Sequence, residues 1–343
     1  MKYTNSKNLF YYTLTFFLLF ARYIFAQLPQ SKHFKLEKLA DGVYAAIATD
    51  SGYAVSNAGI VDLGEKTLIF DTFINPLAAE DLQKAADSLT HNPISYVVNS
   101  HYHDDHIQGN QVFPQNADII STAWTRDEIQ KEEPEQIKWD QENIPDEIKS
   151  MQQKLTEADD SLSKANVKRY INYLIAIKTA LPILKVRLPN VTFDKELIIH
   201  GTKRDAQLIT WGKGHTGSDC VLNLPQDDIV FAGDLLFVKT NPYLADGYPE
   251  DWKRNLRNID RLNPQIIVPG HGPLGNDASL SVLTDYIQSL QNLVSQMIDK
   301  GKTLNDISDK QIPSPYNTWA YPSFFKSNVE FLYNLQKKGD NNR

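Results

Sequence analysis

The densest group of potential metal ligands in this chain lies in residues 101–106, which read HYHDDH. Histidine is the commonest metal ligand in proteins, and neutral imidazole suits zinc. His101 and His103 share one face of an extended chain, so they can reach the same metal ion. Asp105 and His106 are neighbours whose side chains diverge, which makes them available to a second ion. Neither pair completes a tetrahedral shell, so the pattern requires further ligands from elsewhere in the chain.

Four apolar, strand-like runs in other parts of the chain end beside an aspartate or a histidine. They are residues 67–70 before Asp71, residues 207–211 before His215, residues 230–232 before Asp234 and residues 265–268 before His271. Glycine stands next to most of these groups and permits tight turns and close backbone approach. One aspartate after a strand is often a turn residue or a helix cap. The whole set, added to residues 101–106, instead indicates one metal centre at the edge of an α/β sheet.

The order of these motifs resembles that of the metallo-β-lactamase-fold superfamily. The motifs are His-x-His-x-Asp-His at 101–106, Gly-His-Thr at 214–216, Ala-Gly-Asp at 232–234 and Pro-Gly-His-Gly at 269–272. The similarity extends over about residues 35–275. It implies an α/β fold, an αββα sandwich of two mixed β-sheets flanked by helices. Within the superfamily, the chain looks closer to the glyoxalase II, lactonase and general metallohydrolase branches.

The resemblance also implies a centre of two zinc ions per chain, held by two groups of ligands and one shared carboxylate. The first zinc would be held by His101, His103 and His215. The second would be held by Asp105, His106 and His271, with Asp234 bridging the two ions. Asp71 would orient one of the ligand histidines, as carboxylates beside metal sites commonly do.

Such a centre predicts hydrolysis of a small molecule. Two metals that share a carboxylate can hold a hydroxide between them, because zinc lowers the pKa of bound water from about 15.7 to near 7. The same ions polarise a carbonyl, so we expect cleavage of an ester, thioester, lactone or amide bond. Asp105 and Asp234 are the expected catalytic carboxylates, with Asp105 as a proton carrier. Lys239 and Tyr243, which follow Asp234, are candidate substrate contacts.

Two other activities are compatible with the motifs. Hydrolysis of β-lactams is favoured by export from the cell and disfavoured by Asp234. The single cysteine, Cys220, lies in an apolar run and is predicted to be a buried strand residue rather than the cysteine ligand of subclass B1 β-lactamases. The second activity is that of a mononuclear iron persulfide dioxygenase, a class that keeps the histidine-rich motif.

Residues 1–26 have the pattern of a signal peptide, with Lys2 and Lys7 before an apolar run that ends near Ala26. The run is shorter than the roughly 20 residues that span a bilayer, so we expect no stable membrane anchor after cleavage. The expected location is the periplasm or the outside of the cell. Removing three cationic residues with the leader makes the net charge of −7 more negative, which argues against nucleic acid as a partner.

Residues 27–343 are predicted to form one domain with two helical additions. Residues 124–185 carry apolar residues at helical spacing, punctuated by prolines, and predict two or three inserted helices. This insertion would cover the metal site, form a homodimer surface or pack along the flank of the domain. Residues 277–343 predict further helices, because an apolar stripe runs from Leu280 to Ile298.

Overall fold

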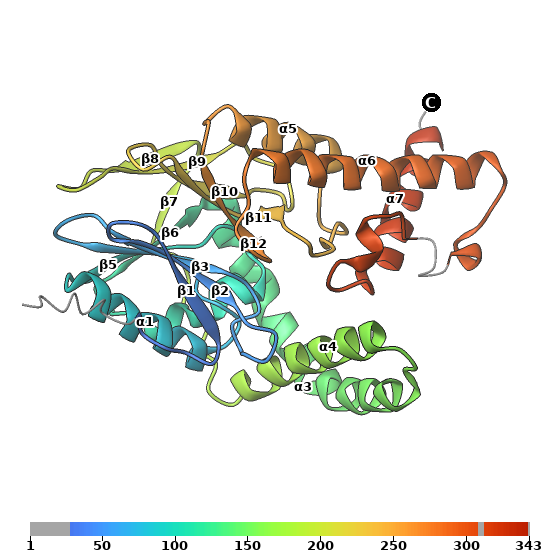
Figure 1. Cartoon of the computed structure of the whole chain (residues 1–343), viewed down its shortest axis with the longest axis horizontal. Helices are drawn as coiled ribbons and strands as arrows, with labels where there is room; N and C mark the ends of the chain where they lie inside the picture. Colours follow the sequence, from blue (N-terminus) through green and yellow to red (C-terminus); the bar gives the residue numbers. More distant parts are fainter. Residues whose placement is uncertain (1–27, 308–311, 342–343) are drawn as a thin grey trace, which may run out of the picture.

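The computed structural model describes residues 28–307 and 312–341, so the predicted signal peptide lies outside the described residues. Two mixed β-sheets form the centre of the molecule (Figure 1). In spatial order, the first sheet contains β1 (Phe34–Ala40), β2 (Val43–Ala48), β3 (Ala58–Asp62), β4 (Thr67–Phe70), β5 (Ile94–Val98), β6 (Asp118–Thr122) and β7 (Val191–Phe193). The second contains β12 (Ile266–His271), β11 (Ile229–Phe237), β10 (Cys220–Leu224), β9 (Ala206–Thr210) and β8 (Glu196–Ile199).

Helices cover the outer face of each sheet. Helix α1 (Pro76–Thr90) packs on the first sheet, and α5 (Pro249–Asp260) and α6 (Asp277–Asp299) pack on the second. Successive residues of a strand point to opposite faces, so a doubly covered strand must be apolar on both. In β4, Leu68 and Phe70 contribute to the core between the sheets, whereas Ile69 contributes to the core under α1. This arrangement confirms the expected αββα sandwich.

Two helical additions extend from the same side of the sandwich (Figure 1). The insertion forms two helices, α3 (Ala123–Glu157) and α4 (Ser161–Ala180), which share an apolar cluster. Helix α3 continues through Pro134 and Pro145, where the sequence suggested interruptions. At the other end of the chain, α7 (Phe324–Asn341) follows α6. Short helical segments occur at α2 (Asp104–Ile107), Gln108–Val112, Leu304–Asp306 and Tyr316–Thr318.

None of the helices in the described part of the chain is both long enough and apolar enough to pass through a lipid bilayer.

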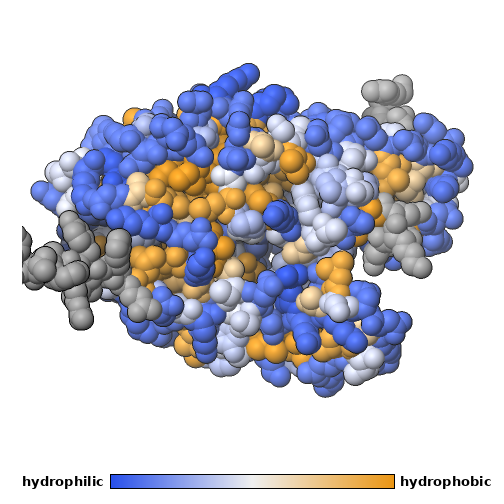
Figure 2. All heavy atoms as spheres, in the orientation of Figure 1, coloured by the Kyte–Doolittle hydropathy of each residue, from blue (hydrophilic) through white to orange (hydrophobic). Residues whose placement is uncertain are grey.

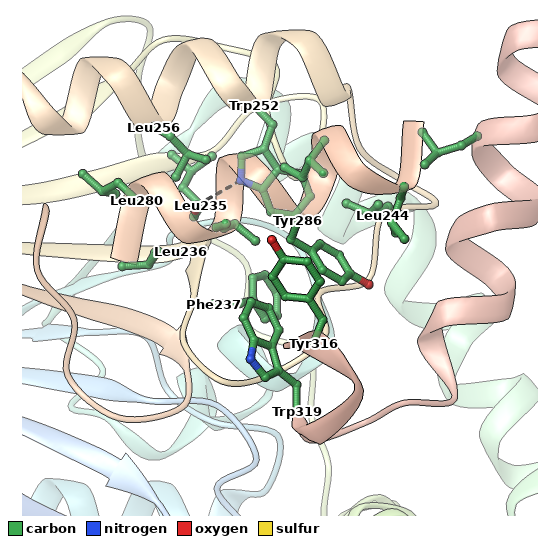
Figure 3. Packing of buried hydrophobic residues seen from close by; sticks show 14 of the residues in the cluster. Leu235, Leu236, Phe237, Leu244, Trp252, Leu256, Leu280, Tyr286, Tyr316 and Trp319 are labelled. Carbon is green, nitrogen blue, oxygen red and sulfur yellow. Dashed lines mark hydrogen bonds between the residues drawn. The ribbon is translucent and has the colours of Figure 1, made fainter. Parts of the chain in front are cut away.

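The core beside the second sheet centres on Trp252 of α5, which is completely buried (Figure 3). Its indole Nε1 donates a hydrogen bond of 2.9 Å to the Leu235 carbonyl oxygen. Its ring lies 4.9 Å from that of His215, centroid to centroid, and 6.1 Å from that of Phe237. This packing connects the core of the sandwich to one of the candidate metal ligands.

Trp252→Ala is expected to lower the free energy of unfolding by about 3–5 kcal/mol, because it leaves a large cavity and an unpaired carbonyl oxygen. Urea denaturation would measure the loss. The matched control is Trp139→Ala, because the side chain of Trp139 on α3 is 49% exposed. That variant should change stability by less than about 0.5 kcal/mol. Equal losses in the two variants would contradict the packing described for Trp252.

Candidate metal centre

All seven predicted ligands lie together at one edge of the two sheets. His101 and His103 follow β5, Asp105 and His106 belong to α2, His215 lies between β9 and β10, Asp234 is in β11, and His271 ends β12. Their side chains form two neighbouring groups, His101–His103–His215–Asp234 and Asp105–His106–His271. Within each group one potential ligand atom from every residue lies within 4.8 Å of the others.

Asp234 does not follow its strand, as the sequence suggested, but lies inside it. Strand β11 extends to Phe237, and its parallel register with β12 is irregular between Phe231 and Phe237. Gly233 has a φ of +51°, a backbone conformation that glycine adopts without strain. An irregularity of this kind can change the direction of a side chain within a strand, so Asp234 can reach the site although β11 continues past it.

The first group brings three imidazole nitrogens together. The Nδ1 atom of His103 lies 3.0 Å from Nε2 of His101 and 3.0 Å from Nε2 of His215. Two nitrogens bound to one tetrahedral zinc ion at 2.0–2.1 Å would lie roughly 3.3 Å apart, close to these separations. Neutral imidazoles that turn their acceptor nitrogens toward each other repel unless a cation lies among them. The first group therefore fits a metal position.

Asp234 joins the first group to the second. Its Oδ2 atom lies 3.3 Å from Nε2 of His215 and 3.4 Å from Nε2 of His271, while its Oδ1 atom lies 3.1 Å from Nε2 of His106. Asp105 completes the second group, with its Oδ2 atom 3.2 Å from Nε2 of His271. The carboxylate of Asp234 can thus contribute one oxygen to each of two metal positions.

Three buried atoms of the candidate ligands have no hydrogen-bond partner within the described residues, namely Nε2 of His106, Oδ1 of Asp234 and Nδ1 of His215. A buried polar atom without a partner costs about 1–3 kcal/mol. The atoms of His106 and Asp234 lie 3.1 Å apart at the second group. A metal ion there would satisfy both, so the residues present fit a second metal position as well.

Asp71 and Ser100 orient two of the ligand histidines from behind. Asp71 accepts hydrogen bonds of 2.8 Å from Nδ1 of His106 and from the hydroxyl and backbone N–H of Ser100. Because the Ser100 hydroxyl donates to Asp71, its oxygen accepts a bond of 2.9 Å from Nδ1 of His101. These bonds direct the Nε2 atoms of both histidines toward the centre. Asp71 thus lies behind a candidate ligand histidine, where the sequence analysis expected it, whereas that analysis missed Ser100.

Asp246 orients His103, and the sequence analysis missed it too. Its Oδ2 atom accepts hydrogen bonds of 3.1 Å from Nε2 of His103 and 2.9 Å from the hydroxyl of Tyr102. The bond from His103 leaves its Nδ1 atom as the acceptor that faces the metal position. The sequence does place Asp246 before Gly247, shortly after Asp234, which is compatible with a loop near the site. Nothing in the sequence, however, pairs Asp246 with His103.

The loop before β3 holds the second group in place. The side-chain amide of Asn57 donates hydrogen bonds of 2.9 Å to the carbonyl oxygens of Pro269 and Gly272, on either side of His271. Gly270 is required here for a steric reason, because a Cβ atom at this position would overlap Oδ1 of Asp234.

Burial and charge divide the histidines into two kinds. Burial lowers the pKa of His215 to about 3 and that of His101 well below its usual value, so both rings are neutral and ready to bind a metal. Burial also lowers the pKa of His271, but Asp234 and Asp105 outweigh it and raise the pKa to about 10. A metal ion at the second group must therefore displace protons.

A cavity of about 450 Å³ lies over the centre and is large enough for a small molecule. Its floor includes His103, His215 and His271. Its walls come from the two helical additions, with Glu133 on α3, Tyr173 on α4 and Phe324 on α7 among the lining residues. The space-filling view is hollowed between these additions (Figure 2).

The two candidate substrate contacts lie in different places. Tyr243 lines the cavity, and its ring centroid is 6.4 Å from that of His103. Lys239 is exposed and lines a smaller adjoining cavity that the larger one meets at Tyr173, Tyr321 and His271. Cys220 is buried in β10, where its thiol donates to the Asn99 carbonyl oxygen, and it belongs to neither group of ligands.

Comparison with known proteins identifies the family of this architecture. The family model described as the metallo-beta-lactamase superfamily matches residues 52–271. Metallo-beta-lactamase type 2 of Elizabethkingia meningoseptica is 28% identical over 105 residues, which cover 29% of this chain and 42% of that protein. Metallo-beta-lactamase type 2 of Bacillus cereus is 33% identical over 82 residues, which cover 22% of this chain and 32% of that protein. The matches therefore span less than half the length of these relatives.

Solved structures show the same fold. A metallo-beta-lactamase from Pontibacter korlensis superimposes with a TM-score of 0.53 and 19% identity, covering 74% of this chain and 99% of that one. The DIM-1 metallo-beta-lactamase superimposes with a TM-score of 0.53 and 16% identity, covering 75% and 98%. The remaining quarter of this chain leaves room for additions to the common fold.

Asp71→Asn is expected to weaken zinc binding about 10–100-fold, because the amide cannot hold His106 and Ser100 as the carboxylate does. Competition with a chromophoric chelator would measure the affinity. Asp87→Asn is the control, since Asp87 is an exposed residue of α1. Equal zinc affinity in the Asp71 variant and the wild type would show that Asp71 does not position the ligands.

Glu133→Gln should stabilise the protein in a pH-dependent way. Burial raises the pKa of Glu133 to about 7 from an ordinary value of 4.5, so the unfolded chain ionises first and folding loses stability as the pH rises between these values. The variant should gain up to about 3 kcal/mol at pH 8 and almost nothing at pH 4.5. Thermal unfolding at both pH values would measure the gain, with Glu142→Gln, on the exposed side of α3, as the control. A gain that does not depend on pH would refute this explanation.

Proposed function

Because the chain belongs to the metallo-beta-lactamase superfamily, we propose that it is a dinuclear zinc hydrolase that cleaves an ester, thioester, lactone or amide bond in a small molecule. The observation that carries this proposal is the position of Asp234 between the two groups, with Oδ1 3.1 Å from Nε2 of His106 and Oδ2 3.3 and 3.4 Å from Nε2 of His215 and His271. A carboxylate so placed can hold two ions close together. The imidazole and carboxylate donors are those that zinc accepts.

Two zinc ions, when bound, lower the pKa of water and polarise a carbonyl oxygen, which supplies both a nucleophile and charge stabilisation. The chain's own residues do the rest. Asp71, Ser100 and Asp246 keep the ligand nitrogens aimed at the centre, so little reorganisation accompanies the reaction. Asp105 lies in the wall of the cavity with an oxygen 3.2 Å from His271, where it can carry a proton toward the leaving group.

Hydrolysis of β-lactams is a second candidate, supported by the names of the curated relatives, which are metallo-beta-lactamases. Against it stands the composition of the cavity wall. Among the described residues, no lysine or arginine lines the cavity over the metal centre, although a β-lactam substrate carries a carboxylate that a cation would be expected to recognise. A mononuclear iron dioxygenase would use one metal position, which leaves the orphan atoms of His106 and Asp234 unexplained.

We also propose that the protein is exported to the periplasm or secreted, on the basis of residues 1–26 alone. A small molecule is the expected partner at the cavity. Formation of a homodimer stays a prediction, for which α3 and α4 offer the candidate surface.

Asp234→Ala is expected to lose one of two zinc ions and to reduce kcat/KM by about 100-fold or more, because both metal positions share this carboxylate. Zinc content by mass spectrometry and hydrolysis of a lactone, a thioester and the β-lactam nitrocefin would test it. Asp260→Ala, at an exposed site on α5, is the control.

Two outcomes would contradict the proposed function. One is full activity of the Asp234 variant, which would exclude the dinuclear centre. The other is that the wild type, with two zinc ions bound, hydrolyses none of the three substrates. One iron per chain with oxygen uptake on glutathione persulfide would favour the dioxygenase instead.

A further inference from the structure

The cavity over the metal centre is acidic beyond its metal ligands. No lysine or arginine of the described residues lines it, whereas four carboxylates outside the ligand set do. These are Asp104, Glu132, Glu133 and Asp246. Glu132 already pairs with Lys131 at 2.7 Å, and Asp246 accepts bonds from His103 and Tyr102.

Glu133 is the most buried of these four carboxylates, and it has no countercharge. Its residue is only 4% exposed, and its one hydrogen bond is donated by the side-chain amide of Gln108 at 2.9 Å. No cation pairs with it in the part of the chain that the structure describes. Burying a carboxylate without a cation is expensive, and burial raises the pKa of Glu133 to about 7 as a consequence. A positive group in the cavity would remove that cost.

Aromatic rings line the same cavity as Glu133. Tyr170 and Tyr173 of α4 lie with their ring centroids 5.7 Å apart, and Tyr321 and Phe324 near α7 stack at 5.8 Å. Faces of aromatic rings attract ammonium groups, and several rings beside one carboxylate are the usual surroundings of a quaternary ammonium ligand. The ring of Tyr321 already receives the guanidinium of Arg169 at 5.9 Å, in line with this preference.

The nearby cations are not available to a negative substrate in this cavity. Arg169 lines the adjoining cavity and makes two hydrogen bonds, of 2.8 and 2.7 Å, to the carboxylate of Asp50. Lys239 also lines the adjoining cavity and is exposed to solvent. An acyl compound with a remote carboxylate would therefore meet Glu133 and aromatic rings in place of a cation.

We propose that the substrate is a carbonyl compound that carries an ammonium group, with its scissile carbonyl at the metal centre and its cation beside Glu133 and the tyrosines of α4. This inference rests on the proposed hydrolase function and names its substrate class. The cavity of about 450 Å³ accommodates a small molecule of this kind.

Binding tests the proposal independently of catalysis. Isothermal titration of the zinc-loaded protein should show benzyltrimethylammonium binding at least about tenfold more tightly than neutral benzyl alcohol. Glu133→Gln should weaken binding of the cation about tenfold, whereas Glu142→Gln, which removes the same charge from the exposed side of α3, should leave it within about twofold. Equal affinity for cation and alcohol, or equal losses in the two variants, would overturn the proposal.

Catalysis tests it with two thioesters of the same shape, acetylthiocholine and its neutral carbon analogue S-(3,3-dimethylbutyl) thioacetate. In both, water adds to the carbonyl, the carbon–sulfur bond breaks, and acetate and a thiol are released. The kcat/KM ratio of cation to neutral ester should exceed about ten and fall in Glu133→Gln. Equal hydrolysis of both esters would overturn the proposed ammonium-bearing substrate class and support the proposed hydrolase function. Glu133-dependent binding of the cation without hydrolysis of either ester would support a cation-binding pocket and count against the hydrolase.

Discussion

The arrangement depends on one buried carboxylate that faces several imidazoles. Asp234 is 4% exposed and has ligand nitrogens from His106, His215 and His271 within 3.4 Å of its two oxygens. Burial raises the pKa of this group, but the positive charge of His271 and His106 more than offsets it, so the pKa lies well below the ordinary value. An ionised carboxylate in a buried position needs that much positive charge around it, whether from protonated histidines or from metal ions.

Elements of both sheets position Asp234 and the histidines around it. The register of β11 against β12 is irregular around Asp234, and Gly270 on the neighbouring strand leaves the space that its carboxylate occupies. Asp71 on one sheet directs His106, while Trp252 on the other side of the core packs against His215. Because the ligands come from both sheets, the two sheets must pack correctly for the centre to form at all.

The motifs predicted the fold, and the seven residues they singled out as candidate ligands lie together, since both depend on short patterns near strand ends. They could not reveal Asp246 or Ser100 as orienting groups, because those contacts arise only from tertiary packing. The extension of β11 past Asp234 to Phe237, with its irregular register, has no sequence pattern beyond the neighbouring glycine. The prolines of the insertion do not interrupt α3, and next to Pro145 the side chains of Ile144 and Ile148 pack against α4.

The helical additions determine the lining of the cavity, because they contribute Glu133, Tyr170 and Tyr173 to its wall above the centre. The central claim is nevertheless the shared carboxylate. Anomalous diffraction at the zinc edge from crystals of the zinc-loaded protein tests it most directly. The account predicts two peaks, one on each side of Asp234, with one of its oxygens bound to each. A single peak held by His101, His103 and His215, with Asp234 bound to no second ion, would contradict it.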